Sequence, residues 1–175
     1  MSDEFKLQVG IDWRSAGIEH AREVRDLLGG DYYIDYADKN SPDGKRVELG
    51  DIIAYHNETT VDWLGGFLQG SYSSGPLSAY GMGGVSQIAY TYQDHFTVAD
   101  EVIEADAIIT TQFKGGVMYD VADNISVFGN FGIVEKPPIM DNVIYFDGTV
   151  ASDPANERFI SSEAGVSYSS GVGVV

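Results

Sequence analysis

Cysteine is absent from the 175 residues, and basic residues are few, with 10 Lys and Arg against 27 Asp and Glu. The lack of thiols excludes disulfide frameworks, Cys-ligated zinc and thiol nucleophiles, although it does not distinguish a reducing compartment from a bacterial envelope. The formal net charge of -17 repels phosphate backbones, and the densest basic cluster is only Gly44-Lys45-Arg46. Nucleic acid is therefore not expected as a partner.

Long hydrophobic runs are also missing. No run reaches the roughly 18 apolar residues that a transmembrane helix needs, so no such helix is expected. Residues 1–4 are acidic at two positions, where a signal peptide would be basic, so no signal peptide is expected there. The length fits one domain or part of one. None of these absences excludes a membrane barrel, which crosses the bilayer with strands.

Four segments alternate between two kinds of side chain, as β-strands with two different faces do. In residues 5–14 every odd position is apolar and every even position is polar, charged or glycine. Segments 109–121 and 160–168 follow the same alternation, with Thr111 and Ser162 on the apolar side and Met118 on the polar side, and 125–133 follows it except at Phe128. Two further segments, 61–72 and 77–92, are Gly-rich and aromatic enough to be strands, but their letters do not assign a facing.

The connections between these segments are of two kinds. Three of them are short and built from turn-forming residues: Ser73–Pro76, Ala122–Asn124 and Ser169–Gly171. The others are long polar excursions over 15–57, 94–107 and 135–158. Short turns at one end of a sheet and long loops at the other predict an all-β protein, an antiparallel up-and-down meander of about six strands, and outer-membrane barrels are built in this way.

The first long excursion contains two local features. Ile18, Ala21, Val24, Leu27 and Leu28 have the spacing of one helix face, which Gly29-Gly30 would end, so a short amphipathic helix is expected there. Four side chains after it suit ligand contact at a loop tip, with packing of the loop on itself as the alternative and favoured interpretation: Tyr32, Tyr33, Asp35 and Tyr36.

Period two alone does not separate a membrane barrel from a soluble sandwich. The polar faces mix Gly, Ser and Gln with single charges of both signs, as the wall of a wet lumen does. Tyr72, Tyr119 and Tyr168 lie beside the tight turns and Trp13 at the far end of its strand, which fits an aromatic girdle at the membrane interfaces. The pattern favours the membrane barrel, and a soluble carbohydrate-binding β-sandwich remains an alternative.

Several motifs resemble one family. The segment Val117–Gly132, VMYDVADNISVFGNFG, resembles the strand, Asp-Asn turn and strand of TonB-dependent outer-membrane receptors. The segment Lys136–Val143, KPPIMDNV, is similar to the continuation of that strand, and DPANERF at 153–159 with SEAG at 162–165 is similar to a later motif. Residues 22–33 resemble a loop of such receptors from Bacteroidetes-like bacteria. The likeness spans nearly the whole chain and is specific only as a combination.

The resemblance implies a location in the bacterial outer membrane and a function in energy-coupled import. Such receptors carry a signal peptide, a TonB-contacting box, a plug domain and about 22 strands, whereas this chain shows none of the first three and about six strands. Residues 1–175 are therefore expected to be part of the barrel, in contact with outer-membrane lipid, with the TonB system engaged through the missing plug and box. The resemblance implies that the imported substrate is a scarce solute of the siderophore, vitamin, glycan or peptide class. A passive porin-like barrel is the other alternative.

No catalytic residues, metal ligands or cofactors are expected from the sequence. His20, His56 and His95 are isolated in the predicted loops, and residues 38–44 depart from a calcium loop at the Asp-Gly position and lack the twelfth-position Glu. Six polar side chains are expected to face the lumen, where they contact the plug or a passing solute or, as the favoured interpretation, pair with each other across strands: Lys6, Asp12, Arg14, Lys114, Asn130 and Glu163.

Overall fold

The computed structural model describes residues 4–97 and 101–170 and shows an all-β chain. Among these residues the one helical element is a 3-10 turn, η1 (Met140–Asn142). Nothing in the described residues is a helix long and apolar enough to cross a membrane.

Six long strands form one antiparallel sheet in meander order. They are β1 (Glu4–Glu23), β4 (Ile52–Ser74), β5 (Leu77–Asp94), β7 (Ile108–Ala122), β8 (Ile125–Lys136) and β9 (Glu157–Tyr168). Each strand pairs with the next one in this series, and all six segments predicted as strands lie within them. The predicted all-β meander of about six strands is confirmed.

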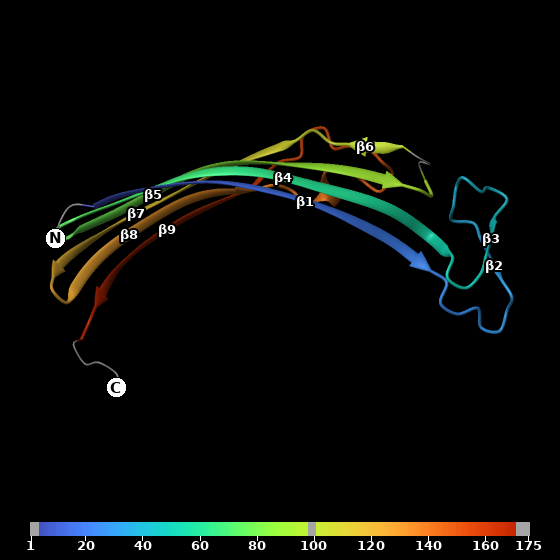
Figure 1. Cartoon of the computed structure of the whole chain (residues 1–175), viewed down its shortest axis with the longest axis horizontal. Coiled ribbons are helices and arrows are strands. Elements are labelled where there is room, and N and C mark those ends of the chain that lie inside the picture. Colours follow the sequence, from blue (N-terminus) through green and yellow to red (C-terminus); the bar gives the residue numbers. More distant parts are fainter. Residues whose placement is uncertain (1–3, 98–100, 171–175) are drawn as a thin grey trace.

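The connections alternate as the sequence predicts. Gly75-Pro76 joins β4 to β5 and Asp123-Asn124 joins β7 to β8, while part of the third predicted turn lies outside the described residues. The long connections carry three short strands, β2 (Tyr33–Asp35), β3 (Lys45–Val47) and β6 (Val102–Glu104). β6 pairs with β5, and β2 pairs with β3 in a separate ribbon. Figure 1 shows the tight turns at one end of the curved sheet and this ribbon beyond the other end.

The expected helix over 18–28 is wrong, and the first loop is shorter than predicted. β1 continues to Glu23 and pairs with β4, which begins at Ile52, so both ends of the predicted loop 15–57 are strand. The backbone pairing of the two long strands overrides the helical spacing of five apolar residues, as tertiary context often overrides local propensity. The chain turns only at Leu28 and Gly29, whose φ angles of 53° and 87° are left-handed.

The sequence leaves open which face of the sheet each side chain of β4 and β5 points to, and the register of strand pairing assigns it. Residues opposite one another in an antiparallel pair lie on the same face, and Val9 is opposite Leu68, which is opposite Gly83. The even positions of β4 and the odd positions of β5 therefore share a face with the odd positions of β1. Trp63 and Phe67 consequently lie on the other face.

Within the described residues the sheet is open, and no closed barrel is seen. β1 and β9 lie at its two edges and each pairs with one neighbouring strand. The outer backbone groups of both strands therefore have no strand partner here. Exposed edges of this length are sites at which further strands add.

The buried core is small and lies toward the loop end. Ile88, Tyr90, Tyr92 and Ile108 on the sheet pack against Val143 and Ile144 of the β8–β9 connection. The phenol of Tyr90 donates a hydrogen bond to the carbonyl of Pro138 at 2.9 Å. The connection thus folds back over the face opposite Val9 and covers its loop-end half.

Candidate functional site

One face of the sheet carries a band of apolar side chains that spans all six long strands. We call it the apolar face, and it takes five alternate positions from each strand: 5–13 in β1, 64–72 in β4, 77–85 in β5, 111–119 in β7, 125–133 in β8 and 160–168 in β9. No Asp, Glu, Lys, Arg or His occupies these positions. Apart from tyrosines, the polar residues at these positions are Thr111 and Ser162. Each strand therefore contributes nine residues, close to the roughly 9–11 that a transmembrane strand needs.

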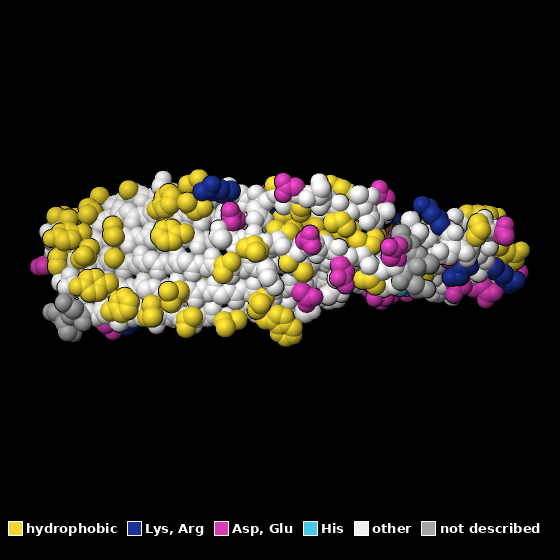
Figure 2. All heavy atoms as spheres, turned by 90° about the horizontal axis from the view of Figure 1, so that it is seen from above, with side chains coloured by type: hydrophobic (Ala, Val, Ile, Leu, Met, Phe, Trp, Pro, Cys, Tyr) yellow, Lys and Arg dark blue, Asp and Glu magenta, His cyan; other side chains and the backbone are white. Residues whose placement is uncertain are grey.

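The side chains of the apolar face are exposed rather than packed under a second layer. On β1 the exposed fractions are 76% for Val9 and 83% for Ile11, and Leu68 and Phe131 on inner strands are 52% and 44% exposed. Figure 2 shows hydrophobic side chains spread over the end of the sheet that carries the tight turns, with acidic side chains gathered toward the loop end. Continuous apolar surface of this extent on a folded protein marks a contact with lipid or with another protein.

Aromatic side chains mark both limits of the band. Tyr72, Tyr119 and Tyr168 lie at the turn end and are 39%, 49% and 67% exposed. Trp13 lies at the opposite limit and is 72% exposed. Beyond Trp13 the same face becomes charged, with Asp62 and Glu58 on β4 and Glu19 on β1. Rings with an apolar body and a polar edge suit a boundary between apolar surface and water.

The opposite face is mixed in character, and all six residues predicted to face a lumen lie on it. We call it the mixed face. Lys6, Asn130 and Glu163 belong to one row across the sheet, in which Ser71, Tyr80 and Gly116 occupy the intervening strands. Asp12, Arg14 and Lys114 lie on the same side of their strands. The two faces therefore differ in charge as the sequence predicts.

Many of the polar groups on the mixed face pair with each other. The amide of Asn130 donates to the Glu163 carboxylate at 3.3 Å and accepts from the Tyr80 phenol at 3.4 Å. Arg14 forms an ion pair with Asp12 at 2.6 Å, and Lys6 forms one with Glu4 at 3.1 Å. Of these contacts, Asn130–Glu163 joins neighbouring strands as the pairing interpretation expects, whereas both ion pairs lie within β1. Exposed pairs of this kind contribute little to stability, about 0–1 kcal/mol each.

The loop-end half of the mixed face holds several buried polar groups. Asn57, Thr59 and Asp94 are each less than a tenth exposed. A cleft of about 130 Å³ between the β8–β9 connection and the sheet is lined by groups including Asn57, Tyr92 and Asp141.

Two ionisable groups beside this cleft have shifted pKa values. Burial, together with the nearby carboxylates of Asp94 and Asp141, raises the pKa of Tyr92 to about 12. Burial also acts to raise the pKa of Asp94, but hydrogen bonds from Thr97 and from the backbone N–H of Phe96 outweigh it and hold that pKa below its usual value. Asp94 is therefore a charged group that ties the end of β5 to the residues after it.

The four predicted loop-tip residues divide into two groups. Asp35 is 6% exposed, and its carboxylate accepts hydrogen bonds from the backbone N–H groups of Ala37 and Ala54 at 3.2 and 3.1 Å. Asp35 thus holds the loop, in agreement with the self-packing interpretation. Tyr32, Tyr33 and Tyr36 are between 51% and 69% exposed, and the Arg46 guanidinium lies 4.4 Å from the Tyr32 ring. These tyrosines remain the ligand candidates at the tip.

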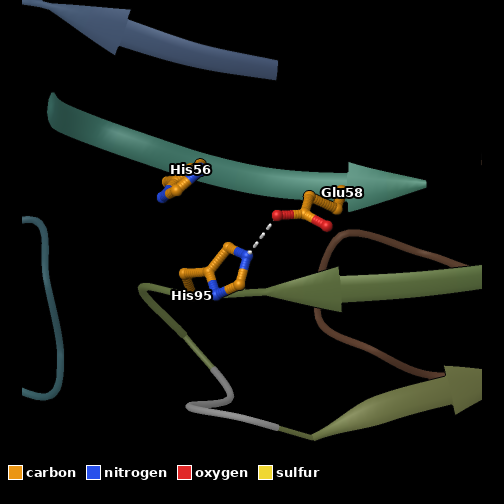
Figure 3. Close-up of side chains that lie close together, drawn as sticks. All are labelled: His56, Glu58 and His95. Carbon is orange, nitrogen blue, oxygen red and sulfur yellow. Dashed lines mark hydrogen bonds and ion pairs between the residues drawn. The ribbon is translucent and has the colours of Figure 1, made fainter. Parts of the chain in front are cut away.

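Three isolated histidines are expected from the sequence, and this expectation is wrong for His56 and His95, which lie side by side. His56 on β4 and His95 just after β5 lie with their ring centroids 4.4 Å apart, and the carboxylate of Glu58, also on β4, reaches toward His95 (Figure 3). The third, His20, is opposite Asn57 and so lies on the mixed face. His56 and His95 lie 39 positions apart in the chain and meet because the β4–β5 hairpin extends to both of them.

Searches among protein families, curated proteins and solved structures found no match to this chain.

Proposed function

We propose that this chain forms part of the wall of a bacterial outer-membrane β-barrel of the TonB-dependent receptor kind. In this proposal the apolar face contacts lipid, the mixed face lines a wet interior, and further strands pair with the open edges of β1 and β9. Hydrocarbon cannot satisfy the backbone groups of an open edge, so the six strands require such partners within the bilayer.

The observation that carries the proposal is the uncharged, uncovered apolar face, which takes five alternate positions from a nine-residue stretch of every long strand. At about 3.3 Å per residue, eight intervals along a strand correspond to roughly 26 Å before any tilt. A tilt of about 35–45° reduces the height to roughly 19–22 Å, somewhat less than the apolar band of about 25 Å on outer-membrane barrels. A soluble sandwich would require a second layer over this band, and in the described residues the covering segment lies on the other face.

The receptor kind within this proposal rests on the sequence resemblance around the Asp123-Asn124 turn and on the division into tight turns and long loops. The long loops would capture a scarce solute outside the cell, and the wall would pass it inward when TonB acts on a plug domain. The exposed tyrosines of the β2 region are the capture residues that we propose for this chain.

Fractionation of cells that make the protein naturally tests the proposal. We expect the protein in the outer-membrane fraction, and we expect a photo-crosslinker on TonB to capture it. Recovery in the outer membrane without TonB capture would instead identify a passive porin-like barrel. Recovery of the protein in the soluble fraction would reject the membrane wall altogether.

A further inference from the structure

The loop end of the apolar face, beyond the uncharged band, holds a cluster of metal-ligating groups from three strands. His56 and Glu58 project from the same side of β4, His95 follows the last residue of β5, and Glu19 lies opposite Glu58 on β1. One ligand atom from each of His56, Glu58 and His95 lies within 4.8 Å of the other two. We propose that this cluster binds a divalent first-row transition metal of the Zn²⁺ class.

The donor set fits this class of cation. Two imidazoles and one or two carboxylates form a nitrogen and oxygen set that suits zinc and its neighbours, whereas Ca²⁺ and Mg²⁺ prefer oxygen alone. In a tetrahedral site with bonds of about 2.1 Å the ligand atoms lie about 3.4 Å apart. His95 Nε2 and Glu58 Oε1 are 3.2 Å apart, and His56 Nε2 and Glu19 Oε1 are 2.9 Å apart. Each pair is therefore close to the spacing that a bound ion imposes.

The backbone and the neighbouring side chains hold the two imidazoles in place. The backbone N–H of His95 donates to the carbonyl of His56 at 2.9 Å, which continues the β4–β5 ladder by one step. The side chain of Asn40 donates to the carbonyl of His95 at 2.9 Å, and the Phe96 ring meets the His56 ring edge-on at 6.4 Å. A site whose ligands are fixed before binding loses less conformational freedom when the metal enters.

Exposure and charge also favour a cation. The side chains of His56 and His95 are 20% and 25% exposed, so the imidazoles are partly shielded, while Glu19 and Glu58 are 61% and 55% exposed and free to adjust. The whole chain carries a net charge of -17, which attracts cations to the protein. With Glu19 as the fourth ligand, the ion would join β1, β4 and β5 as a structural clip. The site stands on these residues alone and does not depend on the proposed membrane function.

Titration of the full chain in detergent micelles with Zn²⁺, and separately with Co²⁺ as a visible probe, tests the site. We expect one Zn²⁺ per chain and Co²⁺ absorption bands typical of tetrahedral coordination. His56→Ala or His95→Ala should lower Zn²⁺ affinity by at least about 100-fold, above the 10- to 100-fold typical for loss of an outer-sphere partner. Glu58→Gln should also weaken binding and change the Co²⁺ spectrum, since it replaces a ligand without removing side-chain volume.

His20→Ala is the matched control, because His20 lies on β1 at the same end of the sheet but on the mixed face. It should bind Zn²⁺ as the wild type does, and circular dichroism should show the same strand content in every variant. Absence of stoichiometric Zn²⁺ binding, or binding that His56→Ala, His95→Ala and Glu58→Gln all leave unchanged, would overturn the proposal.

Discussion

Leu68→Arg is expected to weaken association with phosphatidylcholine vesicles by about 30- to 900-fold. Leu68 lies in the middle of the β4 part of the apolar face and is 52% exposed. Arginine on the lipid face of a barrel costs about 2–4 kcal/mol at the bilayer midplane. Since each 1.4 kcal/mol is a factor of ten, this cost gives the expected loss. Flotation of the assembled barrel that contains this chain, with vesicles in a density gradient, measures it.

Gln69→Arg is the matched control for this prediction. Gln69 is the next residue of the same strand and points to the mixed face, where it lies opposite Gln8 and Met82. The same new side chain at the same depth should change flotation by no more than about threefold, because it faces the wet side. Equal losses for the two variants, or no loss for Leu68→Arg, would show that the two faces do not differ in their contact with lipid.

Ile144→Ala is expected to release the β8–β9 connection from the sheet, at a cost of about 2–4 kcal/mol. Ile144 is 2% exposed and packs with Val143 against Tyr92 and Ile88. Truncation of a buried isoleucine loses its transfer free energy and leaves a cavity, which gives a cost of this size. Hydrogen exchange at the Ala151 amide, which donates to the Val143 carbonyl at 2.8 Å, reports the opening.

The control for Ile144→Ala lies in the same segment. Ile139 is 55% exposed, so Ile139→Ala removes the same atoms without opening a cavity. We expect protection of Ala151 to fall by roughly 30- to 900-fold in Ile144→Ala and by less than about fivefold in Ile139→Ala. If both variants exchange alike, the connection is not held by the buried pair.

The sequence predicts the apolar face on four strands, β1, β7, β8 and β9. On these strands apolar and polar residues alternate, so the sequence alone separates the two faces. β4 and β5 were not readable in this way. Glycine occupies Gly66, Gly70, Gly81 and Gly83 on the apolar face, while Trp63 and Phe67 lie on the mixed face, so hydrophobicity does not separate their two sides. Only the pairing with β1 and β7 assigns them, and that register is a property of the folded sheet.

The proximity of His56 and His95 could be predicted from the sequence, although the sequence analysis places both in loops as isolated residues. The Gly75-Pro76 turn was predicted, and it pairs Ser74 with Leu77, whose residue numbers sum to 151. The same sum joins Asn57 to Asp94, the last pair of the ladder, and it also joins His56 to His95. Extending the hairpin from its turn would therefore have placed the two imidazoles together. The β4–β5 ladder extends beyond the strand segments 61–72 and 77–92 that the sequence predicts.

The docking of the β8–β9 connection had no comparable signal. Val143 and Ile144 lie in a long polar excursion, and their partners Ile88 and Tyr92 are more than 50 positions away in the chain. No turn geometry or strand period relates these segments, because the contact arises from the shape of the surface that the sheet presents. Such contacts follow from the assembled fold rather than from local pattern.

Quenching of the two tryptophans by brominated lipid tests the central claim most directly. Trp13 lies on the apolar face, and Trp63, at nearly the same depth, lies on the mixed face and packs toward the core. With phosphatidylcholine brominated near the headgroup end of its chains, fluorescence of the Trp63→Phe variant, which retains Trp13, should be strongly quenched. Fluorescence of the Trp13→Phe variant should be nearly unaffected. Equal quenching of the two, or a chain that stays a soluble monomer with a cooperative melt when detergent is removed, would contradict the account.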